Sequence, residues 1–579
     1  MLPMRFAAMR VPANASVETK PNLFDFVAIL VMLGLATAIG SVARHTLGPL
    51  AAPDASTIHL NAAYLPGYAV RTTLRMFAAL VASLLFTFTY PVWAAKSRRA
   101  GALLVPILDI LQSVPILGFL TFTYVFFMSL FPGRVLGAEL AVIFTIFTSQ
   151  AWNMAFSMYQ SLKTVPADLE EVSRGFGLSG WQRFWRLEVP YAMPGLVWNT
   201  MMSMSGGWFF IVASEAFSVG STSVALPGIG SFIASAVAHR NIVAVFEAIL
   251  TMLVVILLYD QLLFRPLVAW SARFRLETTP GAVAGDPWML RLLRRTRLLN
   301  QASRLFSDML TSVGGLPLGR RPSAIKRRLV SRRVGDSLWF SLLGFVAAVA
   351  AWQVAIYAYA NLSWPEIGHV MLLGVYTMIR VVTMILLATI VWVPIGVWLG
   401  LRPVWAARAQ PVAQFMAAFP ANLFYPIFVV AIVHYHLSSN VWLTPLMILG
   451  TQWYILFNVI AGAAAFPGDL LEAARNFQIG GWRWWVRVML PGIFPYYVTG
   501  ALTASGGAWN AAIASEVATW GNTTLTASGL GSYIFQATAA GATAKVGLGM
   551  VAMAFFVILF NRLVWRPMYS FANRRLTFS

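Results

Sequence analysis

The sequence predicts an all-α polytopic membrane protein with about twelve transmembrane helices, arranged as two parallel six-helix repeats. Three observations support this fold class. The mean hydropathy of the 579-residue chain is +0.72, and only 11% of its residues are charged, whereas a soluble domain has about 25%. Apolar runs long enough to cross a bilayer recur along the chain. The second half of the chain also repeats motifs of the first half.

The apolar runs define six predicted spans in each half. Those of the first half lie near 24–45, 72–95, 102–131, 136–160, 194–216 and 242–266. Those of the second half lie near 336–358, 375–400, 406–433, 438–461, 495–516 and 544–566. The runs are too long, and alternate too little, for the strands of a membrane barrel. We therefore expect a first domain at 1–269, a linker at 270–335 and a second domain at 336–579.

The basic residues predict the orientation. The linker 270–335 carries fourteen Arg and Lys residues and only three Asp and Glu residues, and cations accumulate in cytoplasmic loops. Six spans per half place the linker and both termini on the same side, so both termini are expected to be cytoplasmic. The first apolar run, 24–45, is interpreted as an uncleaved span. A nucleic-acid role is not expected, because the cations lie beside hydrophobic spans.

Part of the linker has the pattern of a basic amphipathic helix. The stretch "WMLRLLRRTRLLNQASRLF" at 288–306 would suit the anionic surface of a lipid bilayer. The alternative is a solvated spacer.

The repeat is most detailed in two charged, aromatic segments. "DLEEVSRGFGLSGWQRFWRLEVPYAMP" (168–194) and "DLLEAARNFQIGGWRWWVRVMLPGIFP" (469–495) are identical at ten of 27 positions without a gap. The same offset of 301 residues relates Trp208 to Trp509 and Glu215 to Glu516. Both copies insert with the same orientation, which indicates a parallel duplication about an axis along the membrane normal.

Each segment is expected to form two short helices around a turn, held at the cytoplasmic face between the fourth and fifth spans. A rigid helical loop in this place suits docking to a partner. The alternative is a loop that only connects two spans. A simple connector would not be expected to repeat so many residues at the same spacing.

The second copy, "EAARNFQIGGWRWWVRVMLP", closely resembles the EAA loop of ABC-importer permeases, and "EVSRGFGLSGWQRFWRLEVP" resembles it more loosely. The resemblance covers nearly the whole chain as two type I permease domains. "AWNAAIASE", the following "GLG" and "LVWRP" resemble the nitrate/sulfonate/taurine/bicarbonate branch. The resemblance implies that the EAA loops are coupling helices that dock into an ATPase. The docking residues carried over are Glu171, Val172, Ser173 and Gly180, and Glu472, Ala473, Ala474 and Gly481. Val172 and Ser173 depart from the alanine pair, so the two sites are expected to differ.

The resemblance also implies the partners and their cofactors. It implies two copies of an ABC ATPase and a periplasmic or lipid-anchored substrate-binding protein, in a bacterial or archaeal inner membrane. The sequence contains no G-x-x-x-x-G-K-[ST] motif. We therefore expect no cofactor and no enzymatic activity in this chain, with ATP and Mg bound by the partner ATPase.

Several polar and aromatic residues in the spans are candidates for a pathway or gate: Asp109, Gln112, Asn153, Trp208, Glu215, Trp509 and Glu516. A carboxylate within a membrane is energetically costly and is a functional candidate by default. Glu215 and Glu516 would lie near the outer ends of the fifth spans, where the alternative role is to orient a loop. No metal-ligand spacing is present, and the pair His434 and His436 lacks a third ligand.

The sequence therefore favours the permease of an ATP-driven importer, which moves a small solute inward by alternating access. An organic or inorganic anion is one candidate class of solute. The alternatives are an ion-coupled secondary transporter, for which paired docking helices would have no use, and a structural or sensory membrane protein, for which no polar pathway is needed.

Overall fold

The computed structural model describes residues 58–114, 116–219, 222–274, 288–318 and 332–575, together with scattered positions between 25 and 40. The predicted first span, 24–45, lies almost wholly outside the described residues. Within them, six helices are long and apolar enough to cross a membrane, or nine if each bent pair of helices counts as one span. The chain is therefore an all-α polytopic membrane protein, as predicted.

The first half runs from α2 to α11, and most of its length is helical. Its long helices are α2 (Leu65–Lys96), α3 (Arg98–Ser113), α4 (Ile116–Leu130), α5 (Val135–Lys163), α8 (Val189–Ser214), α9 (Ile229–Ala238) and α10 (Ile242–Tyr259). A helical loop of α6 (Ala167–Gly175) and α7 (Gly180–Arg183) joins α5 to α8 through a π-helical turn, η3 (Phe184–Glu188). The sixth span continues from α10 through η4 (Asp260–Phe264) into α11 (Arg265–Ser271).

The second half follows the same order of elements, except that its fourth span, predicted as one helix at 438–461, is broken by a 43° bend before Trp453, whereas α5 is continuous. Its long helices are α14 (Arg332–Asn361), α15 (Trp364–Gly400), α16 (Pro403–Ala418), α17 (Tyr425–His434), α20 (Trp453–Ala464), α23 (Leu490–Ser515), α24 (Leu530–Ala539) and α25 (Thr543–Phe560). Its helical loop comprises α21 (Gly468–Asn476), α22 (Gly481–Trp484) and the π-helical turn η7 (Trp485–Met489). Shorter elements are η6 (Ala421–Phe424), α18 (Ser439–Trp442), α19 (Thr444–Ile448), η8 (Asn561–Trp565) and α26 (Arg566–Arg575).

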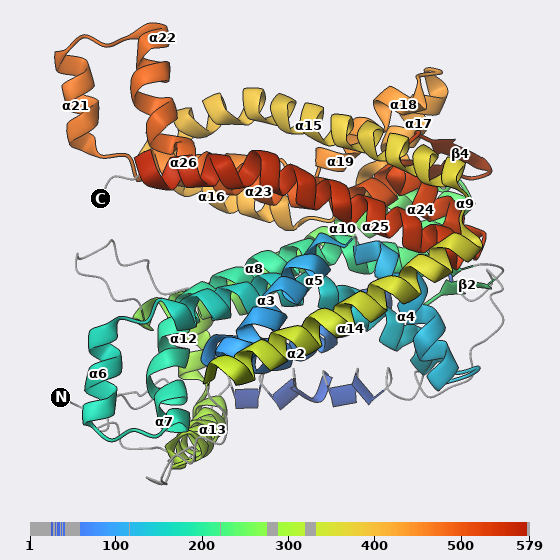
Figure 1. Cartoon of the computed structure of the whole chain (residues 1–579). Helices are drawn as coiled ribbons and strands as arrows, with labels where there is room; N and C mark the ends of the chain where they lie inside the picture. Colours follow the sequence, from blue (N-terminus) through green and yellow to red (C-terminus); the bar gives the residue numbers. More distant parts are fainter. Residues whose placement is uncertain are drawn as a thin grey trace.

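Two short antiparallel hairpins lie directly after the fifth spans. They are β1 (Ala216–Val219) with β2 (Thr222–Ala225), and β3 (Val517–Trp520) with β4 (Thr523–Thr526). Figure 1 shows the two helical loops at one end of the molecule and the hairpins at the opposite end. We refer to these as the loop end and the hairpin end.

The third span of each half is bent, which the sequence prediction missed. The predicted spans 102–131 and 406–433 are each two helices, with bends of 93° between α3 and α4 and 76° between α16 and α17. The breaks fall between Gln112 and Ile116 and between Ala418 and Ala421, and Val114 and Phe419 within them have extended backbones. In the sequence each is followed by a proline, Pro115 or Pro420. Proline removes a backbone donor and disfavours the helical conformation of the residue before it, which favours a break at these places.

Each half has an apolar core with its fifth span at the centre, and the first core also contains Phe419 and Leu423 from the broken third span of the second half. Trp208 on α8 is fully buried in the first core, and Trp509 on α23 is 2% exposed in the second. Both helices are 26 residues long. They carry several Gly, Ser and Thr residues, which lower their mean hydropathy. They are therefore not among the six helices described above as long and apolar enough to cross a membrane.

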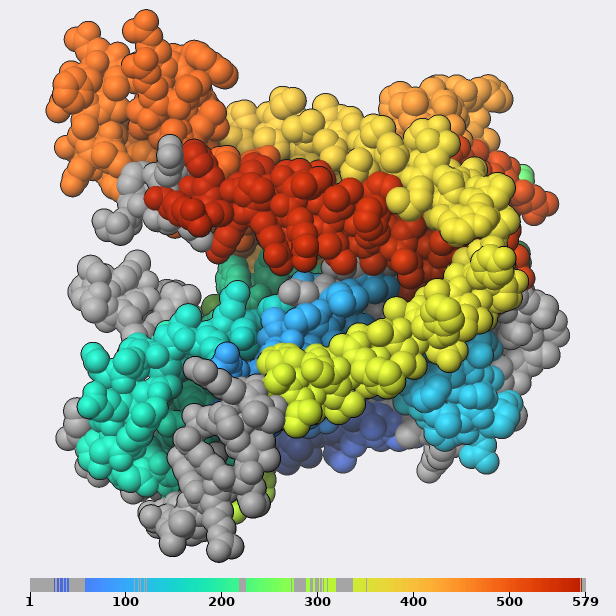
Figure 2. Space-filling model, viewed as in Figure 1, coloured from blue at the N-terminus to red at the C-terminus, as the bar shows by residue number. Residues whose placement is uncertain are grey.

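The two halves touch at the hairpin end and separate toward the loop end. The backbone N–H of Gly521, at the tip of the second hairpin, donates to the carbonyl of Val237 in the first half over 2.9 Å. At the loop end, α6 and α21 lie far apart (Figure 1), and the space-filling surface is hollowed between the halves there (Figure 2). The halves also meet along the fifth span of the first half, where the ring of Trp198 on α8 stacks on Phe457 of α20 with ring centroids 5.5 Å apart. The interface is therefore closed at the hairpin end, and the separation at the other end is between the helical loops.

Candidate functional site

The two helical loops place their repeated residues in the same way. The carboxylates of Glu171 on α6 and Glu472 on α21 are exposed, while Ser173 and Ala474 are 5% and 4% exposed on the inner faces of these helices. Each loop therefore packs a small residue against its own half and leaves the acidic residue accessible to a partner.

The remaining predicted docking positions differ in exposure. Val172 is 44% exposed, whereas Ala473, its counterpart, is partly buried. Gly180 and Gly481 are both exposed at the starts of α7 and α22. At this position the first loop therefore presents a bulkier and more apolar side chain than the second.

Each loop also presents a phenylalanine that the prediction of docking residues left out. Phe176 is 67% exposed and Phe477 is 80% exposed, at the ends of α6 and α21. A large apolar side chain exposed at the same place in both copies suits insertion into a partner surface. The signal available in the sequence was that both copies of the repeat have phenylalanine at this position. A loop that only connects spans gains nothing from an exposed aromatic ring.

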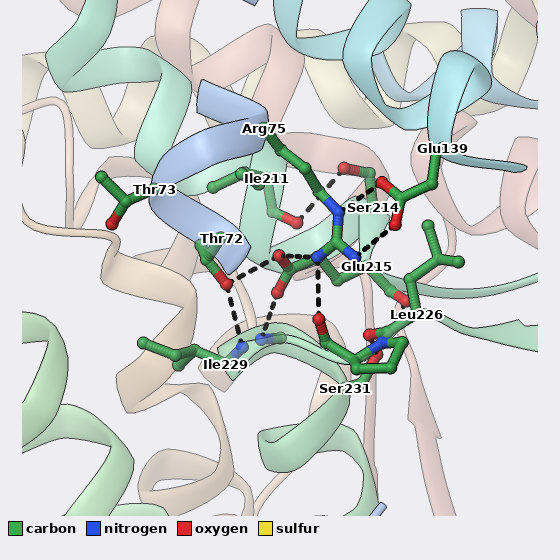
Figure 3. A network of polar contacts seen from close by, with 12 residues as sticks. Thr72, Thr73, Arg75, Glu139, Ile211, Ser214, Glu215, Leu226, Ile229 and Ser231 are labelled. Carbon is green, nitrogen blue, oxygen red and sulfur yellow. Dashed lines mark hydrogen bonds and ion pairs between the residues drawn. The ribbon is translucent and has the colours of Figure 1, made fainter. Parts of the chain in front are cut away.

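A buried network of polar side chains lies at the hairpin end of the first half (Figure 3). Arg75 on α2 donates to both oxygens of Glu139 on α5, at 2.6 and 2.7 Å, and to Oε1 of Glu215 at 2.7 Å. The side chains of Arg75, Glu139 and Glu215 are 3%, 6% and 0% exposed. Buried charges are tolerated when they are paired and hydrogen-bonded, so the three side chains depend on one another.

The carboxylate of Glu215 also accepts a hydrogen bond from the N-terminus of α9. Thr72 donates to its Oε1 over 2.7 Å, and the backbone N–H of Gly230, at the start of α9, donates to its Oε2 over 2.7 Å. The N–H of Ile229 donates to the Thr72 hydroxyl over 3.0 Å. A carboxylate at a helix N-terminus satisfies donors that have no partner within the helix. The network thereby ties α2, α5, α8 and α9 together.

Glycines explain how the start of α9 comes so close to Glu215. A Cβ on Gly228 would lie 2.4 Å from the Glu215 carboxylate, and a Cβ on Gly230 would lie 2.2 Å from the carbonyl of Val212. In the second half, a Cβ on Gly529 would lie 2.2 Å from the Glu516 carboxylate. The repeated G-x-G pattern is therefore what allows backbone donors to reach the buried carboxylates.

The second half builds a related network with one difference. Thr377 donates to Oε1 of Glu516 over 2.8 Å, and Arg380 donates to the same oxygen over 3.1 Å. The position of Glu139 is taken by Asn440, whose Oδ1 accepts from Arg380 over 3.2 Å. Arg380 is 12% exposed, compared with 3% for Arg75. The two networks are thus equivalent in position but not in charge.

These contacts place the predicted gate residues Glu215 and Glu516. Both carboxylates are occupied by donors of their own half, which favours an orienting role at the start of α9 and α24. Their participation in a gate remains a prediction. Sequence reasoning missed the role of Glu139, because a contact between α2 and α5 cannot be read from local patterns.

The other predicted pathway residues are scattered. Trp208 and Trp509 lie in the two cores, Asn153 is exposed on α5, and Gln112 is partly buried near the end of α3. Asp109 belongs to α3, but its side chain lies outside the described residues. The structure does not bring the four described side chains, Trp208, Trp509, Asn153 and Gln112, together into one site.

The broken third spans contact the fifth span of the opposite half. The backbone N–H of Ile116, the first residue of α4, donates to Oδ1 of Asn510 on α23 over 2.9 Å. In the symmetry-related place, Asn422 of η6 donates to the carbonyl of Phe209 on α8 over 3.1 Å. The offset of 301 relates Phe209 to Asn510. The kinks created by Pro115 and Pro420 therefore lie at the interface between the halves.

We expect Asn510→Ala to weaken this interface. The change removes the acceptor that caps α4 and leaves the N–H of Ile116 without a partner, at a cost of about 1–2 kcal/mol. Transport activity and the melting temperature of the purified chain would measure the effect. Asn458→Ala is a control, because its side chain bonds only within its own helix, to the Tyr454 carbonyl. Equal losses in both variants would argue against a role for the inter-domain cap.

The fold and the paired loops define a membrane-spanning subunit of a transport system, built from two related halves. The family described as "Binding-protein-dependent transport system inner membrane component" matches residues 87–264 and 392–575. The two matches together cover more than half of the chain, and the chain belongs to this family as a fused tandem permease.

Curated relatives agree with this family. The chain is 30% identical to the nitrate import permease protein NrtB of Leptolyngbya laminosa over 112 residues, which is 19% of this chain and 38% of that protein. It is 27% identical to the glycine betaine/proline betaine transport system permease protein ProW of Escherichia coli over 205 residues, 35% of this chain and 54% of that protein. It is 24% identical to the bicarbonate transport system permease protein CmpB of Synechocystis over 139 residues, 24% of this chain and 46% of that protein. The alignments thus span about half or less of each relative.

Proposed function

We propose that this chain supplies both transmembrane domains of an ATP-driven importer and moves a small solute inward by alternating access. One observation supports this most directly. Two related helical loops stand at the same end of the molecule, each with an exposed acidic residue and an exposed phenylalanine (Figure 1). Two docking sites of this kind suit two copies of an ATPase subunit, one on each half. ATP and Mg would be bound by those subunits.

The separation of the halves supports the direction of transport. The charge of the linker supports a cytoplasmic location for the loop end, and the two helical loops are separated at that end (Figure 1). The contact between Gly521 and Val237 closes the hairpin end. This arrangement corresponds to an inward-facing state. Closure of the ATPase pair would bring the two loops together and open the hairpin end to a substrate-binding protein outside.

The buried networks suit such a motion. Each ties the hairpin-end parts of several helices within one half, and among the described residues the donors to Glu215 and Glu516 belong to the same half as the carboxylate. Each half can then move as a unit when the loop end is pulled, and the interface between them changes instead of the cores.

For the solute, an inorganic or small organic anion is the first candidate class. NrtB and CmpB are named for nitrate and bicarbonate, whereas ProW is named for betaines. Selection would rest largely with the substrate-binding protein, so ligand screening of that protein would identify the solute.

The test is to purify the chain gently from its native membrane and to identify the proteins that remain bound. We expect a P-loop ATPase to be retained by the native chain and lost from the double variant Glu171→Lys/Glu472→Lys, because both docking faces acquire the opposite charge. Tyr435→Lys is the control: it adds a cation at a residue that is 68% exposed at the hairpin end. Uptake driven by an ion gradient, without any bound ATPase, would instead support a secondary transporter.

A further inference from the structure

Part of the linker between the halves contacts the first helical loop. Helix α13 (Arg297–Gly315) follows α12 (Trp288–Arg295), and its last turn meets α7. The indole Nε1 of Trp181 donates to the carbonyl of Val313 over 2.7 Å, and Nε2 of Gln182 donates to the carbonyl of Gly315 over 2.7 Å. The carbonyls at a helix C-terminus have no partner within the helix. Side chains of the first loop donate to two of those of α13, and the carbonyl of Val313 also accepts from the N–H of Leu316 over 3.2 Å.

Close packing accompanies these bonds. A Cβ on Gly314 would lie 3.2 Å from Cβ of Trp185, so the backbone of α13 passes directly against that tryptophan. The Trp185 ring in turn stacks on Phe88 of α2, with ring centroids 6.0 Å apart. The linker thus contacts a residue that connects the loop to the second span.

Among the residues that the structure describes, the second loop has no counterpart of this contact. Its equivalent of Gln182 is Arg483, and its equivalent of Trp185 is Val486, which is 45% exposed. Trp482, the equivalent of Trp181, is 77% exposed. Three side chains contact the linker in the first half. Two of them are replaced by other residue types in the second half, and the third, tryptophan, is exposed there.

We propose that the C-terminal part of α13 forms one docking surface with the first helical loop, so that the ATPase subunit on the first half binds a composite of α6, α7 and the linker. This inference rests on the proposed function. The subunit on the second half would bind α21 and α22 alone. The linker is then a positioning element: it holds α7 by its last turn and fixes the angle at which α6 is presented.

The first step of the test measures proximity. The chain contains no cysteine, so an introduced pair reports without background. We expect Trp185→Cys/Gly314→Cys to form a disulfide under mild oxidation in native membranes, because the 3.2 Å separation of the two Cβ positions is close to the range of disulfides. The matched pair Val486→Cys/Gly314→Cys should remain reduced. Absence of the first disulfide, or equal formation of both, would overturn the placement of the linker.

The second step measures docking, with variants that spare the fold of the loop. Gln182 also accepts from the N–H of Ser179 over 3.0 Å in a capping box. Gln182→Glu keeps that acceptor and loses the donor to Gly315, while Trp181→Phe keeps a ring and loses the donor to Val313. The double variant Trp181→Phe/Gln182→Glu therefore removes both side-chain bonds to the linker and retains the cap. The backbone bond from the N–H of Trp181 to the carbonyl of Leu318, at 3.4 Å, is unchanged.

The double variant is compared in two backgrounds, with purified ATPase titrated onto the chain in lipid nanodiscs. With Glu472→Lys, binding depends on the first site, and we expect the double variant to weaken it about tenfold. With Glu171→Lys, binding depends on the second site, and the double variant should change it less than about twofold. Equal weakening in both backgrounds, or no weakening in either, would overturn the composite surface. If the native chain binds no ATPase while the first disulfide forms, the proposed function fails and the placement of the linker stands.

Discussion

Arg75→Met is expected to destabilise the first half by about 3–5 kcal/mol, because it removes one partner of a buried ion network and leaves the others charged. The carboxylates of Glu139 and Glu215 are 6% and 0% exposed, and both accept from Arg75. Without the guanidinium, two carboxylates would share a site from which water is excluded. Methionine preserves much of the volume, so the loss would report the charge and not a cavity.

The measurement is thermal unfolding of the detergent-solubilised chain, with size-exclusion profiles before and after heating. Arg380→Met is the matched comparison, and its loss should be smaller, since Arg380 faces one carboxylate and the neutral Asn440 and is 12% exposed. The triple variant Arg75→Met/Glu139→Gln/Glu215→Gln should recover part of the loss, as no charge remains buried. An Arg75→Met protein as stable as the native chain would show that the network contributes little.

Gly228→Ala is the second change with a large expected effect. The new Cβ would lie 2.4 Å from the Glu215 carboxylate, so the carboxylate or the start of α9 must shift. Overpacking alone costs about 1–3 kcal/mol, and the shift would also lengthen the bond from the N–H of Gly230. We expect a lower melting temperature and a loss of transport, because α9 packs beside the hairpins.

Gly206→Ala is the control for this substitution. It also replaces a glycine of the first half, but its Cβ would meet nothing within 4 Å. Transport and stability close to the native values are therefore expected for Gly206→Ala. Similar losses for both substitutions would show that helix flexibility, and not the approach to Glu215, explains the Gly228 effect.

The fold class and the docking loops could be predicted because they are local or repeated properties. Hydropathy identifies spans over about twenty residues, and the repeat marks Glu171 and Glu472 at equivalent places. The bends at Pro115 and Pro420 could also have been read from sequence, since proline restricts the residue before it. That signal was outweighed by the length of the apolar runs around it.

The contacts that organise the hairpin end could not be predicted in the same way. Arg75 and Glu139 are 64 residues apart, and Arg75 and Glu215 are 140 apart. Only the packing of α2, α5 and α8 brings them together. The same holds for the linker: its composition predicts a basic helix, but nothing in residues 288–306 indicates that the chain following them ends on Trp181.

The replacement of Glu139 by Asn440 has a consequence for genetics. In a permease assembled from two identical chains, every substitution occurs twice, and a position must tolerate the same residue on both sides of the axis. Here one gene encodes the two halves as separate sequences, so their sequences can diverge and can be mutated one at a time. A single missense change can then assign a defect to one docking site or one ion network, without the engineered tandem dimers that a homodimer would require.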